Sequence, residues 1–160
     1  MARPLQGGAA DRHALSTPRE EILVILLVDT DILIDIALDR RPHAAPAGDL
    51  VDALERRQAT GFIAWHSVAN FHDLVVSHTG VSATKAFLLD LLRFVQVAPT
   101  STESVRYAAG LPMRDFEDAL QAAAAIACGA NRIATRNVRD YARSPVKATT
   151  PAMLLKELTK

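Results

Sequence analysis

The sequence predicts an α/β fold in which helices cover a central parallel sheet, and two observations support this. The apolar run of residues 22–28 contains no charge, as expected for a strand that is buried on both faces. From Ile22 onward, strand-like and helix-like segments alternate with short breaks, which is typical of parallel sheets. The run stops at Asp29-Thr30-Asp31, and ligands usually bind at this carboxyl edge of an open sheet.

Local signals place the remaining segments along the chain. Gly61 ends one helix before the second strand, and Ser67 and Ser82 can cap the two helices that follow it. Gly129 ends a long Ala-rich helix, and Pro151 suits the first turn of a terminal helix. The expected segments after the first strand are helices at 32–38 and 45–58, a strand at 62–65, helices at 67–78 and 82–92, a strand at 94–97, helices at 101–109 and 116–127, a strand at 132–135 and a helix at 151–158.

Composition is consistent with one domain and sets limits on its partners. The 160 residues are 49% hydrophobic, which is enough for a substantial core. Lys plus Arg and Asp plus Glu number 18 each, so a nucleic acid would have to be bound by a local basic patch. Cys128 is the only cysteine, which excludes internal disulfides and Cys-rich zinc sites and agrees with a reducing compartment.

The first residues differ in character from the rest. Residues 1–21 contain Gly7-Gly8 and two prolines without apolar periodicity, so we expect a disordered leader before a single domain at residues 22–160. The apolar run at residues 22–28 is too short for a membrane span of about 20 residues. Acidic Glu20 and Glu21 precede it where a secretory signal is basic. We therefore expect a cytoplasmic protein with no membrane partner.

Carboxylates supply the candidate chemistry. Asp29, at the end of the buried strand, is suited to a hard cation such as Mg²⁺, although it can also cap the following helix. Asp115 and Asp118 lie on one face at the start of the Ala-rich helix, where two acids can share a metal ion with Asp29. Capping and the helix dipole explain these two acids equally well.

Further polar groups are expected at the same sheet edge. Thr135 and Asn137 end the last long strand, and Ser67 and Asn70 follow the second strand. Arg114 and Arg136 flank the proposed acids and are the best candidates for contact with a phosphate backbone. No phosphate-binding glycine loop of the nucleotide hydrolases or dinucleotide enzymes occurs.

Four sequence blocks together resemble the PIN domain, the metal-dependent ribonuclease fold of VapC-type toxins. The blocks are V-D-T-D-I-L-I-D at 28–35, S-V-A-N at 67–70, D-F-E-D-A-L-Q at 115–121 and T-R-N-V-R-D-Y at 135–141. The resemblance implies a three-layer α/β/α fold whose acids gather at the carboxyl edge of the sheet to hold Mg²⁺ or Mn²⁺. It also implies hydrolysis of RNA phosphodiester bonds, a small antitoxin as partner and a homodimer.

The resemblance assigns roles by position. Asp29, Asp118 and Asp115 are the expected catalytic acids and metal ligands, with Asn137 as a further ligand. Thr30, Ser67, Asn70 and Thr135 are expected to support the site, and Arg114 and Arg136 to bind RNA. Asn70 stands where many members have glutamate, Asn137 where many have aspartate, and Asp31 where many have asparagine, so Asp31 is expected to have a supporting role.

Two alternatives remain open. The neutral Asn70 and Asn137 are compatible with a catalytically weakened module that binds RNA or protein. The spacing of Asp29 and Asp31 also resembles the start of haloacid-dehalogenase-type phosphatases, in which Asp29 would be the nucleophile and Asp31 the general acid/base. That family's later motifs are absent from the sequence.

Overall fold

The computed structural model describes residues 23–160 and confirms the α/β fold with a central parallel sheet. The five strands are all parallel and lie in the order β3-β2-β1-β4-β5. In chain order the elements are β1 (Ile25–Val28), α1 (Thr30–Ala37), α2 (Ala44–Glu55), β2 (Thr60–Ile63), α3 (Trp65–Thr79), α4 (Val81–Leu91), β3 (Val95–Val97), α5 (Thr102–Ala109), α6 (Phe116–Ala127), β4 (Arg132–Ala134), the 3₁₀ helix η1 (Val138–Tyr141), β5 (Ala148–Thr149) and α7 (Pro151–Leu158).

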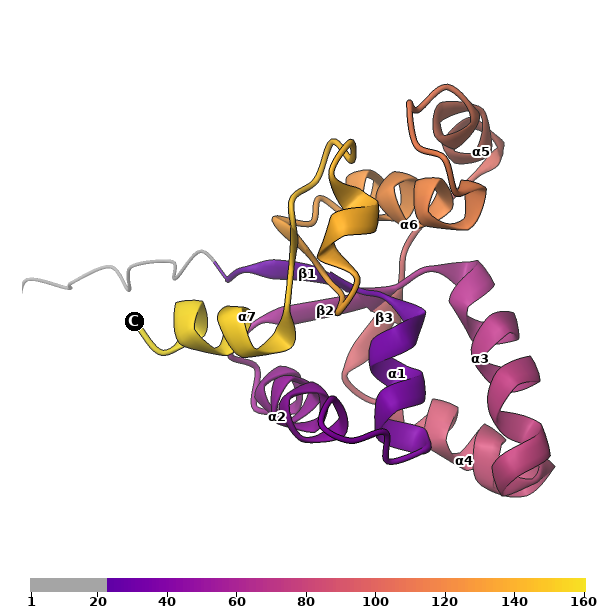
Figure 1. The fold of residues 1–160 in the computed structure, drawn as a ribbon, viewed down its shortest axis with the longest axis vertical. Helices are drawn as coiled ribbons and strands as arrows, with labels where there is room; N and C mark the ends of the chain where they lie inside the picture. The colour runs from indigo at the N-terminus through magenta and orange to yellow at the C-terminus, as the bar shows by residue number, and fades with distance from the viewer. Residues whose placement is uncertain (1–22) are drawn as a thin grey trace, which may run out of the picture.

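Helices cover both faces of the sheet, which explains why the first strand lacks charge. Helices α5 and α6 lie on one face, and α1, α2 and α7 lie on the other (Figure 1). Leu26 and Val28 of β1 pack into the core on the α1–α2 side, whereas Leu27 packs against the alanines of α6. All three side chains are almost fully buried, so a charge anywhere in this strand would lose its hydration.

The strand order creates a crevice between β1 and β4. The chain moves from β1 to β2 and β3 on one side, and the later strands β4 and β5 lie on the other side. In a sheet of this kind the connections that follow two neighbouring strands leave in opposite directions where the order reverses, which leaves room for a ligand between them. Asp29 follows β1 and Thr135 follows β4, and the Asp29 amide donates to the Ala134 carbonyl at 2.9 Å. The crevice therefore lies at the predicted site.

Several predicted boundaries were wrong. Trp65 was expected to end the second strand, but it begins α3, with Ala64 as the extended residue before the helix. Ser67 does not cap this helix, because its side chain is buried within the first turn. Ser82 does not cap α4 either, since Gly80, with φ of +86°, reverses the chain between α3 and α4. Few residues other than glycine adopt this conformation.

Some elements were missed, and part of the prediction falls outside the described residues. Strand β5 has only two residues and η1 a single turn, so neither shows a periodicity in sequence. The proposed leader at residues 1–21 and the start of the apolar run at Ile22 lie outside the part of the chain that the structure describes. Between residues 23 and 160, no helix combines the length and the apolar character that crossing a bilayer requires.

Candidate active site

Asp29 is both a helix cap and the centre of the candidate site. Its Oδ1 accepts a hydrogen bond from the Thr30 amide at 2.7 Å, which caps α1. Its Oδ2 lies 3.0 Å from the Thr135 hydroxyl and 2.9 Å from the Tyr141 hydroxyl, both of which can donate to it. The two interpretations offered by the sequence are therefore compatible, because each carboxylate oxygen has a separate role.

Tyr141 joins Asp29 to the acids of α6. Its hydroxyl also lies 3.3 Å from Oδ1 of Asp118, in the first turn of that helix. Asp115 caps the helix by accepting from the Asp118 amide at 3.1 Å, so it fixes the start of the helix that carries Asp118. Tyr141 ends the fourth sequence block, but it is not among the predicted site residues.

Asp31 anchors the loop that follows β4. Its Oδ2 accepts from the Arg136 amide at 3.3 Å and Nδ2 of Asn137 at 3.1 Å, and it lies 3.1 Å from the Thr135 hydroxyl, whose single proton can go to Asp31 or to Asp29. The backbone N–H of Asn137 also donates to the Thr135 hydroxyl at 3.1 Å. Asp31 thus binds the same threonine as Asp29 and holds the loop against α1.

A buried polar network supports the site from below. The Thr30 hydroxyl donates to Ser67 Oγ at 2.8 Å, and Nε2 of Gln121 lies 2.8 Å from Ser67 Oγ and 3.2 Å from Thr30 Oγ1. Each of these side chains is at most 5% exposed, so the hydrogen bonds replace water for the two hydroxyls and for Nε2 of Gln121, while Oε1 of Gln121 has no partner among the described residues. The network fixes α1, α3 and α6 relative to one another. Gln121 was not predicted, although it belongs to the third sequence block.

Asn70 lies at the rim of the site rather than among the aspartates. Its Nδ2 donates to Oε1 of Glu117 at 2.8 Å, which connects α3 to the first turn of α6. Glu117 is an acid that sequence reasoning left without a role. The pairing places one more carboxylate beside the site.

The site has more negative charge than its surroundings neutralise. Burial, and then the charge of Asp31, raise the pKa of Asp29 from 3.8 to about 7. Burial, and then the charges of Asp115 and Asp29, raise the pKa of Asp118 to about 6. Burial also raises the pKa of Tyr141 far above its usual value, so its hydroxyl keeps its proton and remains a donor. A bound cation would relieve this repulsion.

The donor atoms fit a hard divalent cation. Among residues 23–160, no three His, Cys, Asp or Glu side chains are already arranged as a metal-binding cluster. Two carboxylates, Asp29 and Asp118, do face one hydroxyl, and Mg²⁺ is commonly bound by one or two carboxylates while it keeps several waters. The chemistry of these oxygens therefore suits Mg²⁺ or Mn²⁺.

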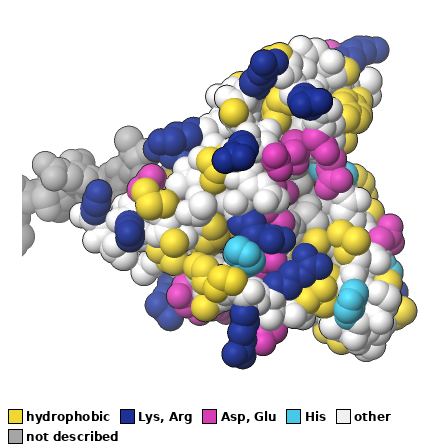
Figure 2. Space-filling model, in the orientation of Figure 1, with side chains coloured by type: hydrophobic (Ala, Val, Ile, Leu, Met, Phe, Trp, Pro, Cys, Tyr) yellow, Lys and Arg dark blue, Asp and Glu magenta, His cyan; other side chains and the backbone are white. Residues whose placement is uncertain are grey.

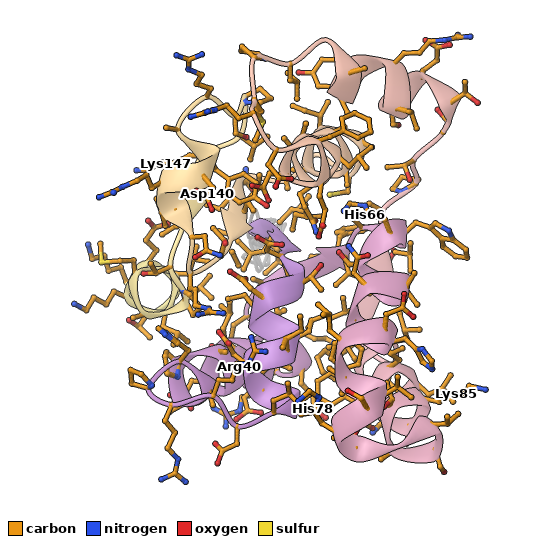
Figure 3. All side chains as sticks on the ribbon, turned by 45° about the vertical axis from the view of Figure 1, so that its right-hand side comes forward. Arg40, His66, His78, Lys85, Asp140 and Lys147 are labelled. Atoms are coloured by element: carbon orange, nitrogen blue, oxygen red, sulfur yellow. The ribbon has the colours of Figure 1, made fainter. Side chains whose placement is uncertain are left out.

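A cavity of about 370 Å³ opens beside Asp118 and carries both signs of charge. Its acidic lining residues are Asp115, Asp118 and Asp140, and its basic ones are Arg114, Arg139 and Arg143. In Figure 2 acidic side chains gather below the α5–α6 layer, with Lys and Arg side chains around them. Figure 3 shows Asp140 on η1 at the edge of this region.

Arg136 lies elsewhere. Its Nε is 3.0 Å from Oδ2 of Asp35, a fully buried carboxylate on α1. The direction of the Nε–H bond does not suit a hydrogen bond, so charge holds this pair together. Arg114 thus lines the cavity, whereas Arg136 pairs with Asp35, and RNA binding by either arginine stays a prediction.

Comparison with known proteins identifies the family. A family model described as a PIN domain matches residues 25–139. The chain belongs to the PIN domain family. Members of this family are typically metal-dependent nucleases and generally use Mg²⁺. Membership separates the chain from the haloacid-dehalogenase-type phosphatases. Among curated proteins, none matches this sequence.

Solved structures share the fold of this PIN domain. VapBC2 from Rickettsia felis, bound to a DNA fragment from its promoter, has a TM-score of 0.63 at 18% identity and covers 79% of this chain and 98% of its own. VapC20 from Mycobacterium tuberculosis, a toxin that cleaves the sarcin-ricin loop, has a TM-score of 0.59 at 14% identity and covers 73% and 93%. VapBC-1 from nontypeable Haemophilus influenzae has a TM-score of 0.58 at 16% identity and covers 81% and 99%.

Proposed function

We propose that this PIN domain is a metal-dependent ribonuclease that hydrolyses RNA phosphodiester bonds. The observation that supports this most strongly is the pair of carboxylates, Asp29 and Asp118, that meet at the Tyr141 hydroxyl. They lie at the crevice of the sheet and have pKa values raised toward neutrality, which is common at functional sites.

In this proposal the residues of the site have separate roles. Asp29 and Asp118 hold Mg²⁺ or Mn²⁺, and Asp115 contributes a third carboxylate at the cavity wall. Asn137 turns its amide nitrogen to Asp31, so its carbonyl oxygen is the atom it can offer to a cation. When bound, the cation would lower the pKa of a coordinated water and neutralise charge on the phosphate. Thr135 and Tyr141 orient the Asp29 carboxylate.

The arginines of the cavity supply phosphate contacts. The space beside Asp118 is surrounded by Arg114, Arg139 and Arg143. One guanidinium group can donate two parallel hydrogen bonds to two oxygens of a phosphate. Arg136 has a different role in the proposal, because its ion pair with Asp35 fixes the loop that carries Thr135.

Cleavage of single-stranded RNA with and without a chelator tests the proposal. We expect cleavage only with Mg²⁺ or Mn²⁺, and loss of at least ~100-fold in rate for Asp118→Asn. The control is Asp49→Asn, which removes an exposed carboxylate on α2 and should cleave like the wild type. Cleavage that survives both the chelator and Asp118→Asn would refute the proposal.

Arginine substitutions test the RNA contact separately. Replacing Arg139 and Arg143 by alanine should weaken RNA binding and reduce its salt dependence, since each phosphate contact releases counterions. Arg93→Ala is the matched control, because Arg93 pairs with the exposed Asp90 of α4 and does not line this cavity. Unchanged affinity for RNA in the double variant would show that these arginines of the cavity do not bind RNA.

A toxin role extends the proposal. The structural relatives include VapBC complexes and VapC20, itself a toxin, which supports a small antitoxin partner here, and a homodimer is proposed with it. Induced expression should stop growth, and Asp29→Asn should restore it.

The competing proposal, a binding module, rests on the neutral Asn70 and Asn137. It predicts RNA binding that metal neither requires nor changes.

A further inference from the structure

Trp65 is an exposed aromatic side chain at the edge of the sheet where the candidate site lies. It is the only tryptophan of the chain, and 72% of its surface is exposed. It begins α3 directly after Ala64, which follows the carboxyl end of β2. An indole in this position buries little apolar surface on folding, so a contribution to the core does not explain why a tryptophan is present here.

A small cavity lies beside Trp65, between the start of α3 and the α5–α6 layer. Its volume is about 220 Å³, which is room for one planar ring system rather than for a helix. Apolar residues of α6, Leu120 and Ala124, form one wall, and the polar residues Ser101 and Ser104 form another. The cavity therefore offers both a stacking surface and a polar rim.

His66 provides the polar atom with no partner. Its Nε2 is buried and makes no hydrogen bond within residues 23–160, and the side chain lines the cavity. In Figure 3 His66 lies at the start of α3, facing the α5–α6 layer. A buried nitrogen of this kind costs free energy until a ligand or a water satisfies it.

The small cavity and the arginine-lined cavity lie on different faces of the same helix, α6. The first turn of this helix carries Asp118 into the arginine-lined cavity, and the next turns carry Leu120 and Ala124 into the small one. Glu117, whose charge acts on His66, pairs with Asn70 between the two. A strand of RNA with a phosphate at Asp118 would therefore pass around the first turn of α6 to reach the cavity beside Trp65.

We propose that Trp65 and His66 form a nucleobase subsite for single-stranded RNA, across the start of α6 from the cavity that Asp118 lines. The base stacks on the indole and places its edge against His66 Nε2. Unpaired RNA bases are commonly recognised by such stacking together with hydrogen bonds to their edges. The choice of RNA as ligand rests on the proposed function. A concave wall with an unpaired polar atom favours a single base over a second copy of the chain.

The sole tryptophan makes the subsite measurable without catalysis. With a chelator present, adenosine monophosphate and a short oligoadenylate should each quench the tryptophan fluorescence in a saturable way. A labelled oligoadenylate should bind Trp65→Ala ~10- to 100-fold more weakly, and Trp65→Phe only slightly more weakly than the wild type. His66→Ala should reduce the difference in affinity among oligomers of A, C and U. Met153→Ala, an exposed apolar change on α7, is the control and should leave all these values unchanged.

The outcomes separate the subsite from the proposed function. Metal-dependent RNA cleavage without any quenching, and with full affinity in Trp65→Ala, would overturn the subsite alone. Quenching by the nucleotides without cleavage would support the subsite and count against the nuclease. Tryptophan emission that depends on protein concentration, with a dimer in the wild type and a monomer in Trp65→Ala, would show that a second copy covers this face and overturn the subsite.

Discussion

Asp29→Asn should stabilise the metal-free protein at high pH while it abolishes the response to metal. The Asp29 carboxyl is 7% exposed and has a pKa of about 7, against 3.8 for the free group. The folded state therefore binds more protons than the unfolded state between these two pH values, and stability falls as the pH rises. Above pH 7 the cost of the buried charge is ~4 kcal/mol, at 1.36 kcal/mol for each pH unit.

The substitution removes this cost but weakens the hydrogen bonds. Asparagine can still cap α1 with its oxygen, but it presents an amide to Thr135 and Tyr141, at a loss of ~1–1.5 kcal/mol. At pH 8 the variant should gain ~2–3 kcal/mol, or ~6–10 °C in melting temperature for a domain of this size. At pH 5 the wild-type cost is only ~1.5 kcal/mol, so the two proteins should melt within a few degrees of each other.

Thermal melts in chelator at pH 5 and pH 8 measure this difference. Asp49→Asn serves again as the control, since loss of an exposed carboxylate should change the free energy of unfolding by less than ~0.5 kcal/mol at either pH. Equal destabilisation by Asp29→Asn at both pH values would refute the reasoning. It would mean that the Asp29 charge is fully compensated by its three donors.

Two further predictions concern the buried carboxylates in and beside the site. Added Mg²⁺ should raise the melting temperature of the wild type more at pH 8 than at pH 5. The reason is that protons compete with the cation for Asp29 and Asp118, whose pKa values are about 7 and about 6. A metal-induced shift of the same size at both pH values would contradict this. Arg136→Ala should destabilise the protein by ~3 kcal/mol, since it leaves the fully buried Asp35 carboxylate unpaired, and Asp35→Asn in the same chain should restore part of the loss. Urea unfolding of the single and double variants measures the change in the free energy of unfolding. Unchanged stability of Arg136→Ala together with weaker RNA binding would instead indicate that Arg136 contacts RNA.

Local chemistry explains which parts of the fold could be predicted. The helix at residues 116–127 and the terminal helix at 151–158 have the predicted bounds, because Asp115 caps the first and Pro151 opens the second. Strand β5 could not be predicted, since its two residues form a strand only by pairing with β4. The cap proposed for Ser67 failed because tertiary hydrogen bonds from Thr30 and Gln121 use its hydroxyl.

The candidate site shows the same division. Topology brings Asp29 and Asp118 together because both follow the carboxyl edge of one sheet, and sequence order is sufficient to anticipate that. Tyr141 and Arg136 lie in one sequence block, yet one turns toward the two aspartates and the other toward Asp35. Tyr141 ends the short helix η1 and Arg136 precedes it, and no periodicity in the sequence reveals this helix.

The contact between Asp31 and Asn137 bears on whether the site has enough charge. Relative to the family pattern that the sequence resembles, Asn137 replaces a common aspartate and Asp31 replaces a common asparagine. The two side chains are hydrogen-bonded to each other at 3.1 Å, so the carboxylate and the amide have exchanged places within one pair. The charge of the pair is unchanged, and Asp31 also raises the pKa of Asp29. The neutral residue at position 137 therefore moves the negative charge by one side chain without removing it, which favours a site that still attracts a cation over a binding module that has lost one.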